Sequence, residues 1–364
     1  MIKETKILYF LKSGREFRVR QGSPDEFLYG FNYLKKLKLD VSLLTETDIG
    51  INSKSGHKIS SLLNMSIYWL FGIPGRSLFN LFLKRKIFYN YDIILVTTNT
   101  FGLSLAFLKK LHLFKPNIVF ISMGLVNKKT PILWSFVYKR ILKNCMVLTL
   151  SAYDAKILEK KLKIEVDYIN FGVDKNFWFN KHKNKPQNYV LTIGNDKNRD
   201  YKTLLKAWKD DFPLLKIITN QKIKSNKKNI EIIFGDWHSS VLSDKEIRKL
   251  IIDSIFVVLP IKDTVQPSGQ SVCLQSMACG KTVLITNFRG LWNKNIMKHN
   301  KTCYFIGRPG DEKKLEESVK TIIVHKTLLK KIGLNARAVI ENNLNSNKMG
   351  KQIYNKINKF ITNE

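Results

Sequence analysis

Short apolar runs alternate with segments of helical period from one end of the chain to the other. In the first half, apolar runs of strand length lie at residues 6–11, 41–45, 92–97, 117–122 and 146–150. Segments with the apolar spacing of amphipathic helices lie at residues 25–37, 103–113, 132–144 and 152–162. Strands that alternate with helices in this way predict a parallel sheet covered by helices.

A second series of the same kind follows a polar, aromatic-rich stretch at 170–188, which is typical of a linker. Its apolar runs lie at residues 189–194, 214–219, 230–235, 255–260 and 282–287. We therefore expect an α/β chain with two Rossmann-like domains, 1–170 and 171–345, that face each other across a ligand cleft. After 302–306 the pattern is helical to the end. Three helices should close the second domain, and we expect the last one, 346–364, to return to the first domain.

The chain is strongly basic, with 62 Lys+Arg against 29 Asp+Glu and a net charge of +33. Residues 51–150 hold 14 Lys+Arg and a single acid, Asp92, which gives this segment a net charge of +13. Such a charge attracts nucleic acid, an anionic membrane face or phosphate-bearing small molecules, unless it reflects only solvated lysines. The hydrophobic fraction of 44% argues against a disordered chain.

The four cysteines lack the spacing of metal ligands, and Cys145 lies in an apolar run, so we expect buried, reduced thiols. The N-terminus shows no signal-peptide cleavage pattern, and a cytoplasmic location is therefore expected.

The longest apolar stretch, residues 62–75, is shorter than the roughly 20 residues of a membrane-spanning helix, and it contains Gly and Pro. The segment after it is apolar and aromatic and carries Arg76, Lys84, Arg85 and Lys86. This composition is typical of a helix pair that lies in a membrane interface. Ordinary core helices explain it equally well.

The chain carries no Gly-x-Gly-x-x-Gly after its first strand, no Walker phosphate loop, and no Ser/His/Asp or His-Glu-x-x-His arrangement. The usual signals of dehydrogenases, nucleotidases and metalloproteases are therefore missing. The most informative segment is 257–287, in which an apolar strand ends at Pro260, a polar loop contains Gly269, and a helix is expected to begin near Ser271. The N–H groups at such a helix start bind phosphate, although an ordinary strand-turn-helix would show the same pattern.

This segment resembles the signature of the retaining GT-B glycosyltransferases of glycosyltransferase family 4. In that family a loop with two glycines leads into a helix that ends in Glu-Ala-Met-Ala-Cys-Gly. The matching pieces, in the family's order, are YINFGVDKNFW (168–178), LTIGNDKNRDYKTLLKAW (191–208), LQSMACGKTVLIT (274–286), RPGDEKKLEESV (308–319) and NARAVIENN (335–343). The resemblance is clear over roughly residues 145–345 and weak before them. It implies a GT-B fold whose first domain takes the acceptor and whose second domain takes a nucleoside diphosphate sugar.

Carried over residue by residue, the resemblance places Arg199 at the family's diphosphate-binding Lys. A guanidinium can bind two phosphate oxygens at once, which suits this position. The chain departs from the family at Asn195, which replaces an Arg, and at Pro267 and Gln275, which replace two Glu. Amides then have to hold the donor sugar. The donor-binding residues implied are Asn195, Arg199, Trp237, Gln266, Ser268, Gly269, Gln270, Ser271, Val272 and Gln275, with catalytic roles assigned to Arg199, Gln270 and Gln275.

Trp237 lies where the family contacts the base, and it could stack on that base or simply pack. Gly22, Ser23 and Asp25 correspond to the loop that approaches the donor phosphate and the acceptor, although Ser23 or Asp25 could serve only as a helix N-cap. Met123 stands where many relatives have a His near the reacting sugar, so the group that assists catalysis is not evident from the sequence.

The resemblance implies that a hexose moves from a nucleoside diphosphate sugar to an acceptor hydroxyl with retention of configuration. The leaving diphosphate takes the acceptor proton, and neither a cofactor nor a metal is expected. The basic first domain suggests a glycan or lipid-linked acceptor at the anionic inner face of a membrane, in cell-envelope polysaccharide or glycolipid synthesis. The alternatives are a sugar-nucleotide binder without activity and a nucleic-acid binder or transferase. The latter is disfavoured because no nucleic-acid motif is present and the aromatics lie within apolar runs.

Overall fold

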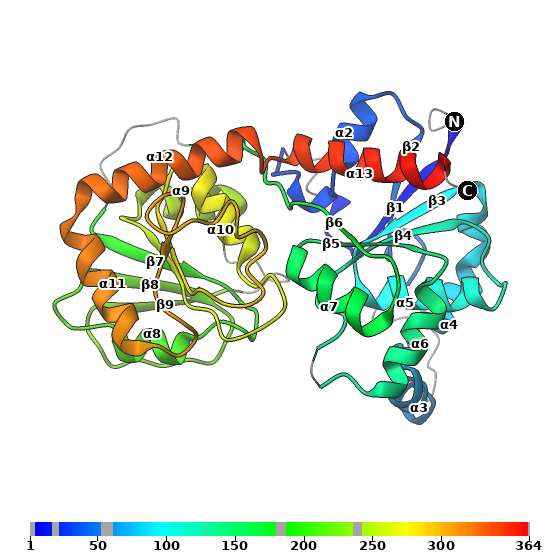
Figure 1. Cartoon of the computed structure of the whole chain (residues 1–364), viewed down its shortest axis with the longest axis horizontal. Helices are drawn as coiled ribbons and strands as arrows, with labels where there is room; N and C mark the ends of the chain where they lie inside the picture. The colour runs from blue at the N-terminus through cyan, green and yellow to red at the C-terminus, as the bar shows by residue number, and fades with distance from the viewer. Residues whose placement is uncertain are drawn as a thin grey trace. The chain divides into compact units, whose positions relative to one another are not determined.

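The computed structural model describes residues 4–16, 22–51, 61–127, 129–179, 187–235 and 242–362. The chain divides into two compact units, coloured along the sequence in Figure 1. Unit 1 comprises Met1–Asn170 and Met349–Glu364, and unit 2 comprises Phe171–Lys348. Each unit contains one six-stranded sheet whose strands all pair in parallel. The α/β architecture with two sheets, expected from the sequence, is confirmed.

The sheet of unit 1 has the strand order β2-β1-β3-β4-β5-β6. Its strands are β1 (Ile7–Leu11), β2 (Val41–Thr45), β3 (Ile93–Val96), β4 (Asn117–Ser122), β5 (Met146–Thr149) and β6 (Asp167–Tyr168). Its helices are α2 (Phe31–Lys36), α3 (Ser61–Phe71), α4 (Gly75–Lys84), α5 (Asn99–Lys110), α6 (Ile132–Leu142), α7 (Ala152–Leu162) and α13 (Ser346–Thr362). The apolar runs predicted as strands therefore form the sheet, and only the two-residue strand β6 was too short for the pattern to show.

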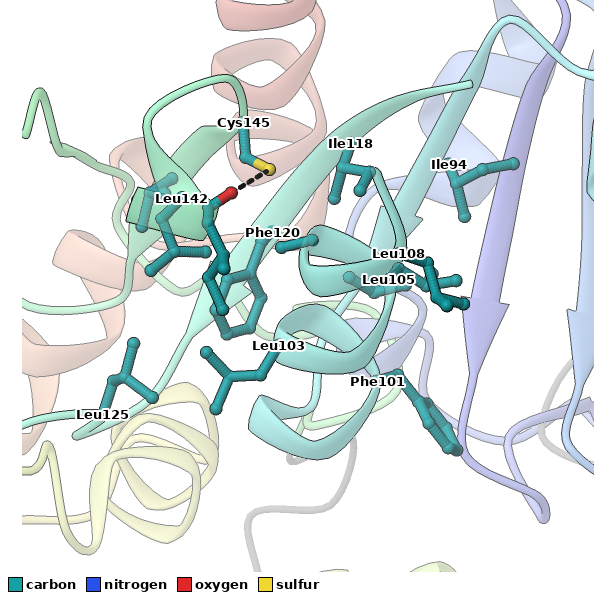
Figure 2. Packing of buried hydrophobic residues seen from close by; sticks show 14 of the residues in the cluster. Ile94, Phe101, Leu103, Leu105, Leu108, Ile118, Phe120, Leu125, Leu142 and Cys145 are labelled. Carbon is teal, nitrogen blue, oxygen red and sulfur yellow. Dashed lines mark hydrogen bonds between the residues drawn. The ribbon is translucent and has the colours of Figure 1, made fainter. Parts of the chain in front are cut away.

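The core of unit 1 lies between this sheet and its covering helices, where Figure 2 shows Leu103, Leu105 and Leu108 of α5 beside Phe120 of β4. At Gly102, a Cβ would lie 2.4 Å from two carbons of the Phe120 ring, so only glycine allows the helix this close to the strand. Cys145 is buried in the same core, and all four cysteines are free thiols, as expected.

The sheet of unit 2 has the strand order β12-β11-β10-β7-β8-β9. Its strands are β7 (Tyr189–Ile193), β8 (Leu214–Thr219), β9 (Ile230–Phe234), β10 (Val257–Leu259), β11 (Val283–Ile285) and β12 (Tyr304–Phe305). Its helices are α8 (Tyr201–Ala207), α9 (Asp244–Asp253), α10 (Gln270–Ala278), α11 (Glu312–Val324) and α12 (Lys326–Asn342). The adjacent strands β7 and β10 are central in this order, so the loops that follow them meet at the carboxyl edge of the sheet.

One predicted helix is wrong. The segment 25–37 is interrupted at Tyr29 and Gly30, which both adopt left-handed backbone conformations. A 3-10 turn, Glu26–Leu28, precedes the break, and α2 follows it. Gly350 of α13 packs against this break, and a Cβ on Gly30 would lie 2.5 Å from the Cα of Gly350, so the contact requires glycine at residue 30. The break therefore lies at a tertiary contact that a local helical pattern does not contain.

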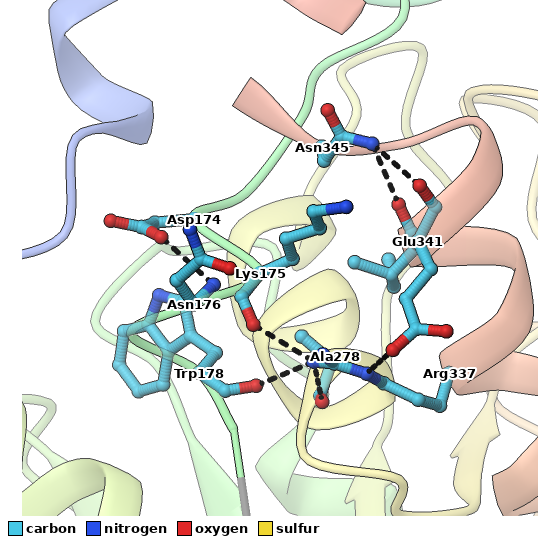
Figure 3. A network of polar contacts seen from close by, with 9 residues as sticks. Asp174, Lys175, Asn176, Trp178, Ala278, Arg337, Glu341 and Asn345 are labelled. Carbon is cyan, nitrogen blue, oxygen red and sulfur yellow. Dashed lines mark hydrogen bonds and ion pairs between the residues drawn. The ribbon is translucent and has the colours of Figure 1, made fainter. Parts of the chain in front are cut away.

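A polar network fixes the carboxyl end of α10 in unit 2 (Figure 3). Arg337 of α12 donates hydrogen bonds from Nη1 to the carbonyl oxygens of Lys175, Trp178 and Ala278. Its Nε is 2.8 Å from a carboxylate oxygen of Glu341. A cation at the carboxyl end of a helix stabilises that end through the helix dipole. The network therefore anchors α10 at the end opposite to its N-cap, Gly269.

Candidate anion site in unit 2 and cavity in unit 1

Two loops meet at the carboxyl edge of the unit 2 sheet. The loop after β7 runs beside the chain that follows β10, where the backbones of Arg199 and Ile261 pair in an antiparallel bridge. The Asp200 N–H donates to Pro260 O at 2.9 Å, and the Lys262 N–H donates to Asn198 O at 2.8 Å. The backbone pairing thereby holds Arg199 at the foot of the loop that leads into α10.

The Arg199 side chain is buried, with 4% of its surface exposed. It lies between two glycines. A Cβ on Gly194, at the end of β7, would overlap the guanidinium, and a Cβ on Gly269 would lie 2.5 Å from Nη1. Gly269 also has φ +78, a left-handed conformation that glycine adopts without strain. Both positions therefore require glycine if the guanidinium is to keep this place.

Two of the three guanidinium nitrogens of Arg199 have no hydrogen-bond partner among the described residues. Its Nε and Nη1 atoms are buried and bond to nothing in the part of the chain that the structure describes, where no Asp or Glu forms an ion pair with it. An arginine stays protonated in proteins, so it cannot avoid the cost by becoming neutral. Burial of an uncompensated ion costs several kcal/mol. A site with this arrangement suits an anionic ligand that brings the missing acceptors.

The start of α10 adds further donors beside this cation. Gly269 is the N-cap of the helix. The N–H groups of Ser271 and Val272 have no backbone acceptor within the described ranges, as is usual in the first turn of a helix. The helix dipole adds partial positive charge at this end. Buried guanidinium, free amides and dipole together form a cradle for phosphate-like anions, and we call these residues the Arg199 cradle.

Several other donor-binding residues predicted from the sequence lie near this cradle and bond to neighbouring loops. The Ser268 hydroxyl donates to the Asp196 carboxylate, and Asn198 Nδ2 donates to Gln266 Oε1 at 3.0 Å. These two bonds tie the loop after β7 to the loop before α10. Gln270 and Gln275 are both buried on α10. Trp237 lies outside the described residues.

Both polar atoms of the Asn195 side chain bond to the backbone of neighbouring loops. Its Nδ2 donates to Gly235 O at 3.2 Å, and its Oδ1 accepts from the Asn220 N–H at 2.7 Å. These bonds connect the ends of β7, β8 and β9. The residue that replaces the family's Arg therefore organises loops in this conformation.

Sequence reasoning missed Gly194, Asp196 and Asn198 as parts of the site. Gly194 lies directly after the apolar run of β7, and a glycine at the end of a central strand is a usable signal for a close approach. Nothing in the pattern could have shown that Asp196 bonds Ser268, because the two residues are far apart in sequence and meet only through the sheet.

Unit 1 has a cavity of about 520 Å³ near the carboxyl ends of β3 and β4. Three aromatic side chains line it, Tyr68 from α3 with Trp134 and Tyr138 from α6. Its polar lining comes from Asn99, Thr100, Asn127, Lys129 and Thr130. Aromatic faces with a few polar groups are typical of small-molecule sites.

Asp154 of α7 is the buried carboxylate of this region. The Gly124 N–H donates to its Oδ2 at 2.9 Å, whereas Oδ1 has no partner among the described residues. Burial raises the pKa of Asp154 to about 6, and the Gly124 bond opposes part of that rise. Met123, which stands at the position of the family's His, is held by Asn99, whose side chain bonds both its N–H and its carbonyl. Asn99 and Asp154 thus fix the start of the loop that lines the cavity.

In the predicted phosphate or acceptor loop, the structure describes Gly22, Ser23 and Asp25. Gly22 has φ +63, and Asp25 stands at the N-cap position of the 3-10 turn Glu26–Leu28 without a side-chain capping bond. Asp25 Oδ2 instead accepts from Asn32 Nδ2 at 3.2 Å. Ser23 is half-buried.

A scan against models of known protein families finds no match, and a search of curated protein sequences finds none either. Solved structures do match over nearly the full chain. HepE from Anabaena in complex with UDP-glucose aligns with a TM-score of 0.69 at 13% identity, covering 98% of this chain and 100% of that one. Sucrose-phosphate synthase from Thermosynechococcus elongatus aligns with a TM-score of 0.71 at 15% identity, covering 99% and 100%.

A glycosyltransferase from Rickettsia africae aligns similarly, with a TM-score of 0.70 at 16% identity over 99% of this chain and 100% of that chain. Identities this low establish the fold alone. None of the described helices has both the length and the apolar character needed to cross a bilayer. The chain thus has the two-sheet GT-B fold that its sequence predicted.

Proposed function

We propose that the protein is a glycosyltransferase that binds the diphosphate of a nucleotide sugar in the Arg199 cradle. The observation that carries this proposal is the buried guanidinium whose Nε and Nη1 have no partner among the described residues. Two fold neighbours support it, because one is described as a glycosyltransferase and another was crystallised with UDP-glucose. A diphosphate supplies both the charge and the in-plane oxygens that a guanidinium binds best.

The reaction we propose is transfer of a hexose to an acceptor hydroxyl with retained anomeric configuration, as in glycosyltransferase family 4. Arg199 and the N–H groups of Ser271 and Val272 would stabilise the charge that develops on the leaving diphosphate. The leaving phosphate oxygen would accept the proton of the acceptor hydroxyl. Gln270 and Gln275, buried on α10, are our candidates for contacts with the sugar and ribose hydroxyls.

Unit 2 is then the donor domain and unit 1 the acceptor domain. The aromatic and amide lining of the unit 1 cavity suits the faces and hydroxyls of a glycan. We propose a glycan or lipid-linked acceptor, used at the cytoplasmic, anionic face of a membrane in cell-envelope polysaccharide or glycolipid synthesis. The net charge of +13 over residues 51–150 supports an anionic surface as partner.

Binding of nucleotides tests the donor assignment. Calorimetric titration or thermal shift with UDP, GDP and ADP, each against its monophosphate and nucleoside, should single out one diphosphate. We expect the diphosphate to bind at least about tenfold more tightly than the monophosphate, because the cradle holds a second phosphate. Equal affinity for diphosphate and nucleoside would contradict the assignment.

Turnover separates an enzyme from a binder that has lost activity. Slow hydrolysis of one nucleotide sugar without acceptor, measured as release of the nucleoside diphosphate, is the expected outcome. Binding with no hydrolysis or transfer across a panel of donors and acceptors would support the inactive binder instead.

We also propose that transfer needs no metal ion, because Arg199 and the helix start supply the positive charge. Donor hydrolysis should therefore change less than about twofold between EDTA and added Mg²⁺ or Mn²⁺. A loss of activity in EDTA that Mg²⁺ or Mn²⁺ restores would contradict this part of the proposal.

A further inference from the structure

Five of the exposed large apolar side chains of unit 1, each more than half exposed, lie on two helices that are distant in sequence. They are Met65 and Trp69 of α3 with Ile132, Leu133 and Phe136 of α6. Trp69 is 76% exposed and Ile132 is 89% exposed. We call these five residues the α3–α6 apolar surface. Figure 1 shows α3 beside one end of α6, at the side of unit 1 opposite to α13.

An aromatic contact and two hydrogen bonds join the two helices that carry this surface. The rings of Tyr68 and Trp134 lie edge to face with centroids 5.1 Å apart. Trp134 Nε1 donates to Trp69 O at 2.9 Å, and the Tyr138 hydroxyl donates to Gly72 O at 2.9 Å. The carbonyl that Trp134 uses belongs to the Trp69 backbone, so the Trp69 ring takes no part in this bond. These contacts join the two helices without the polar atoms of the five exposed apolar side chains.

Cations accompany this surface, and the sequence segment 51–150 that contains both helices has only one acid. Lys129 precedes α6, and Lys139 and Arg140 lie on its exposed face. The Arg140 guanidinium lies 4.4 Å from the centre of the Phe136 ring. The only acid in residues 51–150 is Asp92, which accepts the Lys6 N–H at the start of β3. Exposed Trp, Ile and Phe among lysines and arginines are typical of a surface that enters the headgroup region of an anionic membrane.

We infer that the α3–α6 apolar surface docks on an anionic lipid bilayer, with Trp69, Ile132 and Phe136 in the interface and Lys129, Lys139 and Arg140 on the headgroups. The inference gives the proposed membrane acceptor a specific docking face. It differs from the sequence hypothesis of an interfacial α3–α4 pair in its second helix, because the exposed apolar side chains of α6 are more exposed than Phe79 and Leu83 of α4, at 39% and 43%. A second copy of the chain is a poor occupant, since two segments of charge +13 would repel each other. The cavity lined by Tyr68 and Trp134 adjoins this surface, so a lipid-linked glycan could reach it from the membrane.

Cosedimentation with vesicles tests the inference on the full chain without any nucleotide. We expect strong binding to phosphatidylcholine vesicles that contain phosphatidylglycerol, and weak binding to phosphatidylcholine alone. The double variant Trp69→Ser/Ile132→Ser should bind the anionic vesicles at least about tenfold more weakly, because the apolar area that enters the interface is lost. The matched control is Val324→Ser/Leu334→Ser, which removes two side chains of unit 2 that are 70% and 61% exposed. It should bind within about twofold of the unchanged protein.

A charge variant separates the two contributions. Lys129→Glu/Lys139→Glu should weaken binding to anionic vesicles and leave the residual binding to neutral vesicles unchanged. Quenching of tryptophan fluorescence by lipids with brominated chains should also fall in Trp69→Phe, because Trp69 has the most exposed indole in the described part of the chain. Thermal unfolding of each variant reports whether its fold is intact.

Three results would overturn the inference. Equal partitioning of the unchanged protein onto neutral and anionic vesicles would show that anionic headgroups do not contribute to binding. Undiminished binding of Trp69→Ser/Ile132→Ser would exclude this surface. Self-association, or binding to single-stranded DNA, that the same double variant abolishes while vesicles are ignored would assign the surface to another occupant. Nucleotide binding by the double variant should be unchanged, so failure of this inference is distinguishable from failure of the donor assignment.

Discussion

The carboxyl edges of the two sheets carry buried ionisable side chains of opposite charge, and the two side chains differ in their hydrogen bonding and in how they can respond to burial. In unit 2, Arg199 is buried between Gly194 and Gly269 with Nε and Nη1 unpartnered among the described residues. In unit 1, Asp154 is buried with one oxygen bonded to Gly124, and its pKa is raised to about 6. A carboxylate can relieve burial by taking up a proton, whereas a guanidinium cannot. The Asp154 carboxylate can lose its charge below about pH 6, whereas the unit 2 cation depends on an anionic ligand to balance it.

The difference shows how one sheet topology supports two kinds of site. Both edges place loop residues at the ends of parallel strands, as this architecture requires. The loop sequences then decide the chemistry: glycines and a cation in unit 2, aromatic and amide side chains around a cavity in unit 1. We therefore expect an anion at the first edge and a neutral polyhydroxylated molecule at the second.

Replacement of the cation should give the largest effect. In Arg199→Met, a side chain of similar length lacks the charge, and affinity for the nucleoside diphosphate should fall about 100-fold or more. The unliganded variant should be as stable as the unchanged protein or more so, because a buried unpaired ion is removed. Calorimetric titration and thermal unfolding measure the two quantities.

Lys262→Ala is the control, since it removes an exposed cation from the neighbouring loop. It should change affinity by less than about threefold, because an exposed charge is screened by solvent. If Arg199→Met loses stability and binds normally, Arg199 is a structural residue and the contrast with Asp154 fails.

A glycine pair gives the next effect. In Gly269→Ala the new Cβ would lie 2.5 Å from Arg199 Nη1, so the guanidinium must move and affinity for the diphosphate should fall about tenfold or more. Gly280→Ala is closely matched, because Gly280 follows the other end of α10 with φ +72 and a Cβ there would meet nothing within 4 Å. Both variants should lose about 1 kcal/mol of stability from the left-handed backbone.

Affinity measured for both variants separates strain from contact. We expect the affinity for the diphosphate to fall in Gly269→Ala and to stay unchanged in Gly280→Ala. Equal losses in the two variants would mean that the helix, rather than the Arg199 position, sets the affinity.

The pH dependence of unit 1 should give the smallest effect. The raised pKa of Asp154 means that the folded protein binds this proton more tightly than the unfolded chain, so its contribution to stability falls as pH rises from about 4 to about 6. Asp154→Asn cannot titrate. The stability of the variant relative to the unchanged protein should therefore rise by about 1 to 2 kcal/mol across this window and stay level above it.

Denaturant unfolding at several pH values measures that difference, in which the other carboxylates cancel. A constant difference between pH 4 and pH 7 would show that Asp154 is not the buried acid described here. Diphosphate affinity should be unaffected, because Asp154 belongs to the other unit.

The local apolar pattern predicted the strands well, because strands that are buried on both faces consist of continuous apolar runs, such as 117–122 and 214–219. It did not predict the break at residues 29–30, where Gly30 packs against Gly350, or the two-residue strands β6 and β12, which are too short to carry a pattern. Tertiary contacts of this kind lie outside any local window.

The candidate site was predictable in part. Arg199 and Gly269 were named through their places in a family pattern, and the structure brings them into contact distance. The Asp196–Ser268 bond and the use of Asn195 as a loop tie could not be seen, because they depend on which loops the sheet order brings together. The same holds for the α3–α6 apolar surface, whose two helices meet only in the folded chain.

A structure of the protein with a nucleoside diphosphate bound tests the central claim most directly. The account predicts diphosphate oxygens within hydrogen-bonding distance, about 2.7 to 3.2 Å, of Arg199 Nε or Nη1 and of the Ser271 or Val272 N–H. A diphosphate bound elsewhere in the chain, with the Arg199 guanidinium still lacking acceptors, would contradict it.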